Sequence, residues 1–167
     1  MLIEQNIASG QYVLGSISNL DAQGFPALEY LVWEGNSTGD IVNSFINDSN
    51  RGSYSSALSG RCKELTSAVY NEWSSSYSAM YLQQDGTDVG SSLGMVVNSL
   101  NLDFEKFIRD GKVGIPLGIR SLGNPLPRHI EAPYSGNSKV LLKASLEGLL
   151  QLIDGSTANS ASLSTYM

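Results

Sequence analysis

The segment Gly24–Gly35, GFPALEYLVWEG, is the part of the sequence that decides the fold, because it predicts one short helix. Pro26 suits a first helical turn, where its missing N–H would have no partner and its φ is already helical. Glu29 follows near the positive end of the helix dipole, where a carboxylate is favoured. We expect Gly35 to close this helix.

A much longer helix is predicted from about Ser53 to Gln83, because apolar residues recur there every three or four positions. This apolar face consists of Tyr54, Leu58, Cys62, Leu65, Val69, Trp73, Tyr77 and Met80. The many serines of the segment lower its intrinsic helix propensity, so we expect burial against other elements to hold the helix. Its aromatic residues, with Trp33 and Tyr81, are interpreted as core packing, and a pocket lining is the alternative.

Two further helices follow with the same spacing of apolar residues. One is predicted from Ser91 to about Arg109, with Ser91 or Ser92 as its N-cap and Gly111 as its stop. The last is predicted over Ser138–Ile153, and Gly155 lies just beyond its end. No segment of useful length alternates as a strand does. The sequence therefore predicts an all-α fold of antiparallel helical bundles.

A long connection, residues 112–137, separates the last two predicted helices. It contains four of the five prolines of the chain and several glycines. A connection of this length inside a compact domain is usually functional or poorly ordered. The polar tail, residues 156–167, has no apolar period, and we expect it to be frayed.

Charge and hydropathy argue against a nucleic-acid partner and against a membrane span. The net charge of -6 at pH 7 argues against nucleic acid, because no basic stripe is present to displace counterions from phosphates. No apolar run approaches the roughly 20 residues that a membrane span needs. The first residues, MLIEQN, do not resemble a signal peptide. Cys62 is the only cysteine, which excludes an internal disulfide, and we expect it to be a buried small hydrophobe.

Three blocks of the sequence, in the expected order, resemble the imelysin family of imelysin-like peptidases and iron-regulated envelope proteins. The blocks are Gly24–Trp33, the long helix with Trp73 and Tyr77 that leads through Ser92 to Val96–Asn101, and Lys112–Gly118 with Glu131–Ser138. The signature of the family reads Gly-x-His-x-x-Glu. Gly24 and Glu29 match this signature, whereas Pro26 stands where the family has its histidine.

The resemblance implies two packed helical bundles and a periplasmic or cell-envelope location. It also implies a link to iron acquisition or to metal-dependent peptidase activity. Members of the family are about twice as long, so we expect this chain to be an internal piece or a truncated chain. Residues 1–50 would be the later part of a first bundle, and residues 51–155 would supply helices of the second bundle.

The candidate binding residues follow from the family signature and from the long connection. A histidine and a glutamate three apart on a helix share one face and can hold one metal ion, but proline has no ligand atom. Glu29 therefore has either a structural role or a retained binding role. His129, the only histidine, replaces the lost ligand if the connection covers the helix of Pro26; otherwise it is a solvated side chain. The predicted ligand or metal-binding residues are Gly24, Glu29, His129, Glu131 and Ser135, with Glu29 and His129 as metal ligands.

These observations favour a non-catalytic envelope protein that binds a metal, an iron species or another small ligand in iron acquisition. A zinc hydrolase needs about three protein ligands and an open position for water, and one histidine makes a poor zinc site. Oxygen-rich binding of calcium or iron needs fewer histidines. Two alternatives stay open: a metal-dependent peptidase that recruits His129 or a residue outside this chain, and a helical scaffold that binds another envelope protein. No catalytic residue is assigned.

Overall fold

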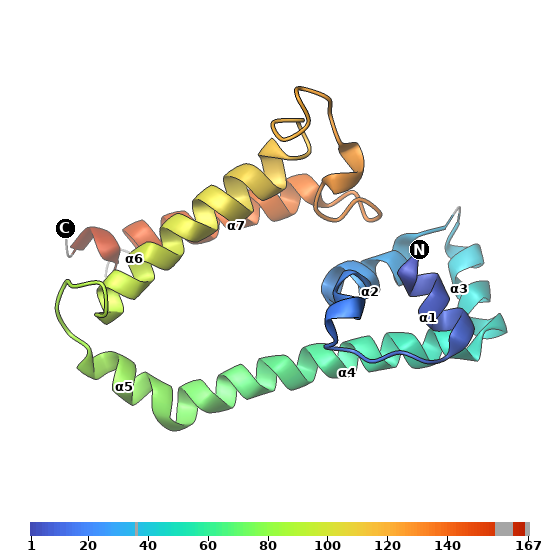
Figure 1. The fold of residues 1–167 in the computed structure, drawn as a ribbon, viewed down its shortest axis with the longest axis horizontal. Helices are drawn as coiled ribbons and strands as arrows, with labels where there is room; N and C mark the ends of the chain where they lie inside the picture. The colour runs from blue at the N-terminus through green and yellow to red at the C-terminus, as the bar shows by residue number, and fades with distance from the viewer. Residues whose placement is uncertain (36, 156–161, 166–167) are drawn as a thin grey trace. The chain divides into compact units, whose positions relative to one another are not determined.

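The computed structural model is all-α, as the sequence predicts, and describes residues 1–35, 37–155 and 162–165. No strand occurs in these residues, and none of their helices is long and apolar enough to cross a bilayer. The chain divides into two compact units, Met1–Met80 and Tyr81–Met167, which are described separately (Figure 1). The helical elements of the first unit are α1 (Leu2–Ser9), η1 (Ile17–Ala22), α2 (Gly24–Trp33), α3 (Thr38–Asn47), α4 (Ser49–Glu72) and η2 (Trp73–Tyr77). The chain continues through α5 (Ser78–Gln83) into α6 (Ser92–Leu102), η3 (Asp103–Gly114), η4 (Pro127–His129), α7 (Ser138–Asp154) and η5 (Leu163–Thr165).

In the first unit, α1, α2 and α3 pack against the first half of α4 (Figure 1). Their apolar faces meet in one core, in which Ile7, Leu31, Tyr54 and Leu58 are almost completely buried. The rings of Tyr12 and Tyr54 meet edge to face, with centroids 4.6 Å apart. Burying a large apolar side chain contributes about 1.5–3 kcal/mol, so these few residues supply much of the stability of a small unit.

A buried polar network joins α1, η1 and α4 inside this core. The hydroxyl of Tyr54 donates a hydrogen bond to the carbonyl oxygen of Ala22. It accepts one from Asn6 Nδ2 at 3.1 Å, and the same Nδ2 donates to Asn19 Oδ1 at 3.0 Å. Burial raises the pKa of the Tyr54 phenol, so this group stays neutral and keeps its proton for donation.

The apolar face of α4 is buried only in its first turns, which corrects the expectation of burial along its whole length. Tyr54 and Leu58 are buried, whereas Leu65 is 50% exposed and Val69 is 72% exposed. Cys62 is half-buried and is not a core residue. The reason is that α1, α2 and α3 are short and contact only the beginning of α4 in this unit.

The helix of Pro26 ends differently from the prediction. α2 begins at Gly24, as expected, but its last residue is Trp33. Glu34 caps it in an extended conformation, and its N–H donates to the carbonyl oxygen of Tyr30 at 2.9 Å. The expectation that Gly35 closes the helix is therefore wrong, because an ordinary residue ends it without a left-handed turn.

In the second unit, α6 and its continuation η3 run antiparallel to α7 (Figure 1). Of the two predicted N-caps, Ser91 and Ser92, it is Ser91 that caps α6, and its hydroxyl accepts from the N–H of Gly94 at 3.0 Å. Gly111 does not stop the helix, because it lacks the positive φ of a helix-ending glycine and the chain continues in π-helical form to Gly114. α7 ends at Asp154, and Gly155 follows with a φ of 86°, as predicted.

The long connection that leads from η3 to α7 is folded into a defined structure. Pro116 and Gly118 are buried, and the carbonyl oxygen of Pro116 accepts from the N–H of Leu126 at 2.8 Å. Gly118 has a φ of 93°, and its carbonyl oxygen accepts from the N–H of Gly123 at 2.9 Å. Backbone hydrogen bonds within the connection therefore fix its path.

The structure divides the chain into compact units after Met80. Tyr54 and Leu58 belong to the core of the first unit, so the first turns of α4 are part of that unit. The assignment of residues 1–50 and 51–155 to two bundles of a longer protein stays a prediction. Of the tail expected to be frayed, residues 156–161, 166 and 167 lie outside the described residues, and Ser162 is buried before the short helix η5.

We predict that Tyr54→Phe lowers the free energy of unfolding by about 1–3 kcal/mol, because the buried carbonyl of Ala22 loses its donor. Urea denaturation followed by circular dichroism measures this change. Tyr70→Phe is the matched control, because Tyr70 is 68% exposed on the same helix. Equal effects of the two substitutions would contradict the role of the network.

We predict that Gly118→Ala destabilises the second unit more than Gly123→Ala does. Both positions have a positive φ, which costs an L-residue about 1–2 kcal/mol. A Cβ atom at Gly118 would also lie 2.6 Å from the carbonyl oxygen of Asn124, whereas a Cβ atom at Gly123 has no atom within 4 Å. We expect a difference of about 1–3 kcal/mol between the variants from this overlap, measured by urea denaturation.

Candidate functional site

The first part of the candidate site is the outer side of α2. Gly24 starts this helix with a φ of 77°, a backbone conformation that favours glycine. Ala27, Tyr30 and Leu31 are buried, so they fix one side of the helix against the core. Pro26 is exposed and Glu29 is half-buried, and residues three apart share a helical face. A histidine at position 26 would therefore share its face with Glu29, but the proline ring offers no ligand atom.

A cluster of polar side chains holds α2 in place from its inner side. The Tyr30 hydroxyl donates to Glu4 Oε1 at 2.7 Å, and Arg51 Nη2 donates to the same oxygen at 2.7 Å. Burial, together with the hydrogen bond to Glu4, raises the pKa of Tyr30, so the phenol remains a hydrogen-bond donor. Glu4 and Arg51 were not predicted from the sequence, because no spacing signal links residues 47 positions apart in the chain.

The remaining predicted site residues lie in the connection before α7. His129 is exposed at the end of η4. The carboxylate of Glu131 forms an ion pair with Lys112, and the carbonyl oxygen of Glu131 accepts a hydrogen bond from the hydroxyl of Ser138. Ser135 is half-buried in the turn that precedes α7. Glu131 therefore ties the connection both to η3 and to the start of α7.

The five predicted residues belong to two different units. Gly24 and Glu29 lie together on α2 in the first unit, whereas His129, Glu131 and Ser135 lie along one connection in the second. Within residues 1–35, 37–155 and 162–165, no three His, Cys, Asp or Glu side chains gather where they could hold a metal ion. The role of these residues in ligand or metal binding stays a prediction.

A second ion pair fixes the outer part of the connection to η3. The guanidinium of Arg120 makes a two-pronged contact with Asp110, with Nε 3.1 Å from Oδ1 and Nη2 2.8 Å from Oδ2. Hydrogen bonds from Arg120 hold the pKa of the Asp110 carboxyl below its ordinary range. Such planar paired contacts are more specific than single ones, so they define the orientation of the loop.

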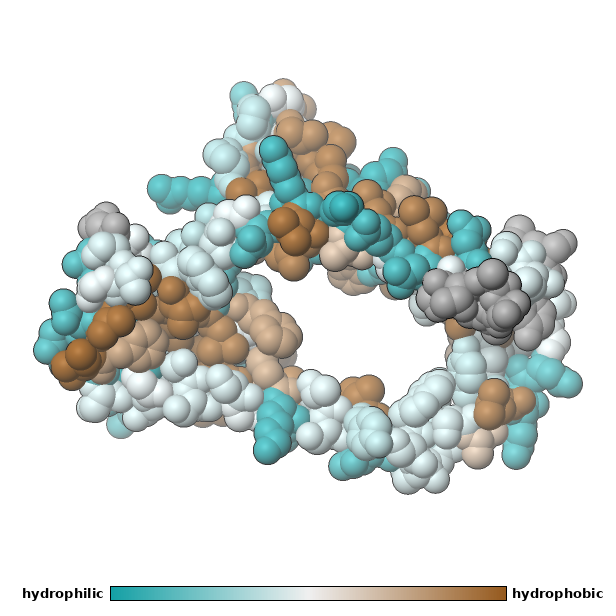
Figure 2. Space-filling model, turned by 180° about the vertical axis from the view of Figure 1, so that it is seen from behind, coloured by the Kyte–Doolittle hydropathy of each residue, from teal (hydrophilic) through white to brown (hydrophobic). Residues whose placement is uncertain are grey.

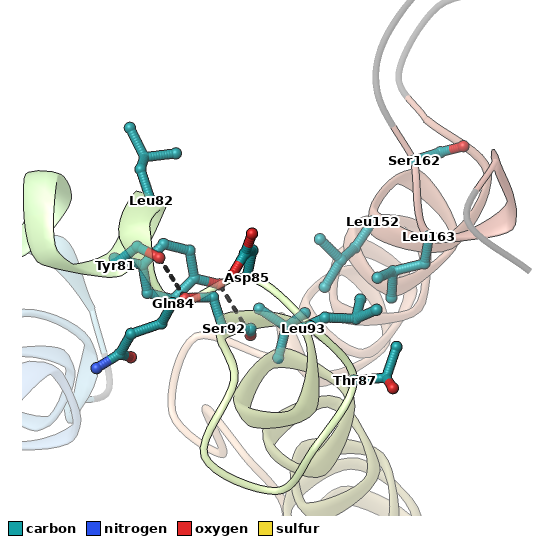
Figure 3. A pocket seen from close by; sticks show the side chains of 12 residues that line it. Tyr81, Leu82, Gln84, Asp85, Thr87, Ser92, Leu93, Leu152, Ser162 and Leu163 are labelled. Carbon is teal, nitrogen blue, oxygen red and sulfur yellow. Dashed lines mark hydrogen bonds between the residues drawn. The ribbon is translucent and has the colours of Figure 1, made fainter.

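The second unit also has a cavity of about 580 Å³ beside the start of α6 and the end of α7 (Figure 3). Its size is typical of a small-molecule pocket. The hydroxyl of Ser92 donates to the carbonyl oxygen of Tyr81, and the Tyr81 hydroxyl donates to the carbonyl oxygen of Ser92 at 3.2 Å. Leu93 and Leu152 supply apolar lining, and Asp85 supplies a carboxylate. Of these residues, only Tyr81 was a candidate from the sequence, as an aromatic residue at helical spacing.

Comparison with known proteins gives a match to a family model. The model described as Imelysin matches residues 5–166, which is nearly the whole chain. No curated protein and no solved structure matches the chain.

We predict that Asp110→Asn lowers the melting temperature at pH 7 and that this difference disappears in acid. The folded pKa of Asp110 lies below its ordinary value of 3.8, because Arg120 stabilises the charged form. The stabilisation is therefore complete above that value and is lost as the pH falls through the lower folded pKa.

Calorimetric scans of both proteins between pH 7 and about pH 2 measure this convergence. Glu147→Gln is the control, because its pair with Lys143 is longer, 3.4 Å, and both side chains are more than half exposed. We expect a smaller effect there. A difference for Asp110→Asn that persists unchanged at the lowest pH would contradict the ion-pair explanation.

Proposed function

Because the chain belongs to the imelysin family, we propose that it is a non-catalytic cell-envelope protein that binds a metal- or iron-related ligand in iron acquisition. The observation that carries this proposal is Pro26, which stands at the histidine position of the family signature on the same face as Glu29. Proline cannot coordinate a metal, so the imidazole that the signature offers to an ion is missing. The carboxylate of Glu29 remains, and oxygen ligands suit hard cations such as calcium or ferric iron.

A metal-dependent peptidase is the less favoured function. Catalytic zinc sites use about three protein ligands, and His129 is the only histidine of the sequence. Glu131, the acidic residue nearest to His129 in the sequence, is engaged by Lys112. Cleavage of unfolded casein by the purified chain in the presence of zinc, manganese or iron would favour the peptidase and contradict a non-catalytic role.

We predict that the chain binds calcium or ferric iron and that Glu29→Ala weakens this binding about tenfold or more, as loss of a coordinating oxygen should. Pro26→His should strengthen zinc binding, because it places an imidazole three residues before Glu29 on one helical face. Isothermal titration calorimetry with zinc, calcium and iron salts measures both effects.

Glu34→Ala is the matched control for Glu29→Ala, because Glu34 is an exposed acid that caps the same helix. It should leave the affinity unchanged. Binding that is lost equally in both variants would indicate a nonspecific charge effect. The helical scaffold would be favoured if the parent chain bound none of these ions and if Glu29→Ala and His129→Ala had no measurable effect.

A further inference from the structure

The outer part of the connection between η3 and α7 exposes large apolar side chains to solvent. Within residues 115–130, here called the apolar loop, Leu117 is 65% exposed, Ile119 is 71% exposed and Leu122 is 99% exposed. Single exposed apolar residues are common on proteins, but three within residues 117–122 are a local concentration of exposed apolar side chains. Figure 2 shows hydrophobic residues beside strongly hydrophilic ones over this part of the second unit.

The backbone at Leu122 has an unfavourable conformation as well as an unfavourable exposure. Its φ is 53°, in the left-handed region, where leucine is strained and glycine or asparagine is normal. No packing of the Leu122 side chain offsets this strain, because 99% of the residue is exposed. Strained residues that persist in a defined structure are typical of functional positions.

Ion pairs and a backbone hydrogen bond hold the apolar loop in place, with its exposed side chains in solvent and not packed against the helices. The two-pronged contact between Arg120 and Asp110 anchors it to η3. The ion pair between Lys112 and Glu131 closes its base. The hydrogen bond from the N–H of Leu126 to the carbonyl oxygen of Pro116 crosses it at 2.8 Å.

The charge of the apolar loop differs from that of the whole chain. The net charge of the chain is -6, yet no Asp or Glu occurs between residues 111 and 130. Asp110 and Glu131, which flank this stretch, pair with Arg120 and Lys112. Arg128 makes no ion pair within the described residues, and both Arg128 and its neighbour His129 are exposed. The loop therefore combines apolar side chains with a small positive charge.

We propose that the apolar loop docks the protein on the surface of a bilayer that contains anionic lipids. Leu117, Ile119 and Leu122 insert at the boundary between headgroups and acyl chains, and Arg128 lies at the level of the headgroups. A membrane fits better than an acidic groove on another protein, because the exposed apolar side chains are aliphatic: leucine is under-represented among protein hot spots but is common on membrane-surface segments. The loop contains no aromatic residue other than His129. This inference is independent of the metal-binding function proposed above.

Cosedimentation with vesicles tests the proposal. The parent chain should bind vesicles of phosphatidylcholine mixed with phosphatidylglycerol more strongly than vesicles of phosphatidylcholine alone, and salt should weaken the difference. Leu122→Asn should weaken binding about tenfold or more, because an inserted apolar side chain is lost. The same substitution should keep or raise the melting temperature, since asparagine tolerates the left-handed backbone.

Two matched controls distinguish docking through the apolar loop from nonspecific adsorption to vesicles. Ile17→Asn removes another highly exposed apolar residue, 89% exposed in the first unit, and should leave binding unchanged. Arg128→Gln should weaken binding to the anionic vesicles about fivefold, whereas Lys139→Gln should not. No binding of the parent chain to anionic vesicles would overturn the proposal. Equal binding by Leu122→Asn and Ile17→Asn would overturn it as well.

Discussion

The hydroxyl of Tyr54 is the group on which the first unit depends most, because it satisfies buried polar groups from two other elements. It donates to the carbonyl of Ala22 and accepts from the amide of Asn6, so it joins η1 and α1 to α4. A buried polar group without a partner costs more than a hydrogen bond contributes, so such a network specifies one arrangement. Because only Gln23 separates Ala22 from the start of α2, the same network fixes where the helix of Pro26 and Glu29 begins.

The second unit uses charged side chains for a comparable purpose. Its long connection has little core of its own, and the ion pairs of Asp110 with Arg120 and of Lys112 with Glu131 attach it to η3. Backbone hydrogen bonds and the left-handed Gly118 determine the turns between these attachments. This construction explains how the connection can be ordered while its leucine and isoleucine side chains remain in water. The groups that stabilise the loop are therefore different from the apolar side chains that it exposes to solvent.

Membership of the imelysin family does not by itself decide which ligand groups this chain offers. The imelysin model matches residues 5–166, which establishes the family. The residue types at the signature decide which chemistry is available, and here a proline has replaced the imidazole beside Glu29. The buried Tyr30 and its contact with Glu4 and Arg51 hold that face in position. An ordered helix face that offers a carboxylate but no imidazole is the basis for proposing binding without catalysis.

The sequence by itself determined the all-α class, the start of α7 at Ser138 and its end just before Gly155, and it limited the cap of α6 to Ser91 or Ser92, because each depends on local spacing or local backbone preference. It could not determine how far the apolar face of α4 is buried, because that depends on the length of the helices that cover it. It also assigned helix ends to Gly35 and Gly111, where a glycine allows a stop but does not require one.

Only the tertiary structure identified the pairs of Glu4 with Arg51 and Asp110 with Arg120. The first pair joins residues far apart in the chain, and the second forms only after the connection folds back onto η3. Periodicity reports which face of a helix is apolar, but it carries no information about which distant side chain meets it. The strained exposure of Leu122 is likewise invisible in the sequence, because it arises from hydrogen bonds that close the loop around Gly118.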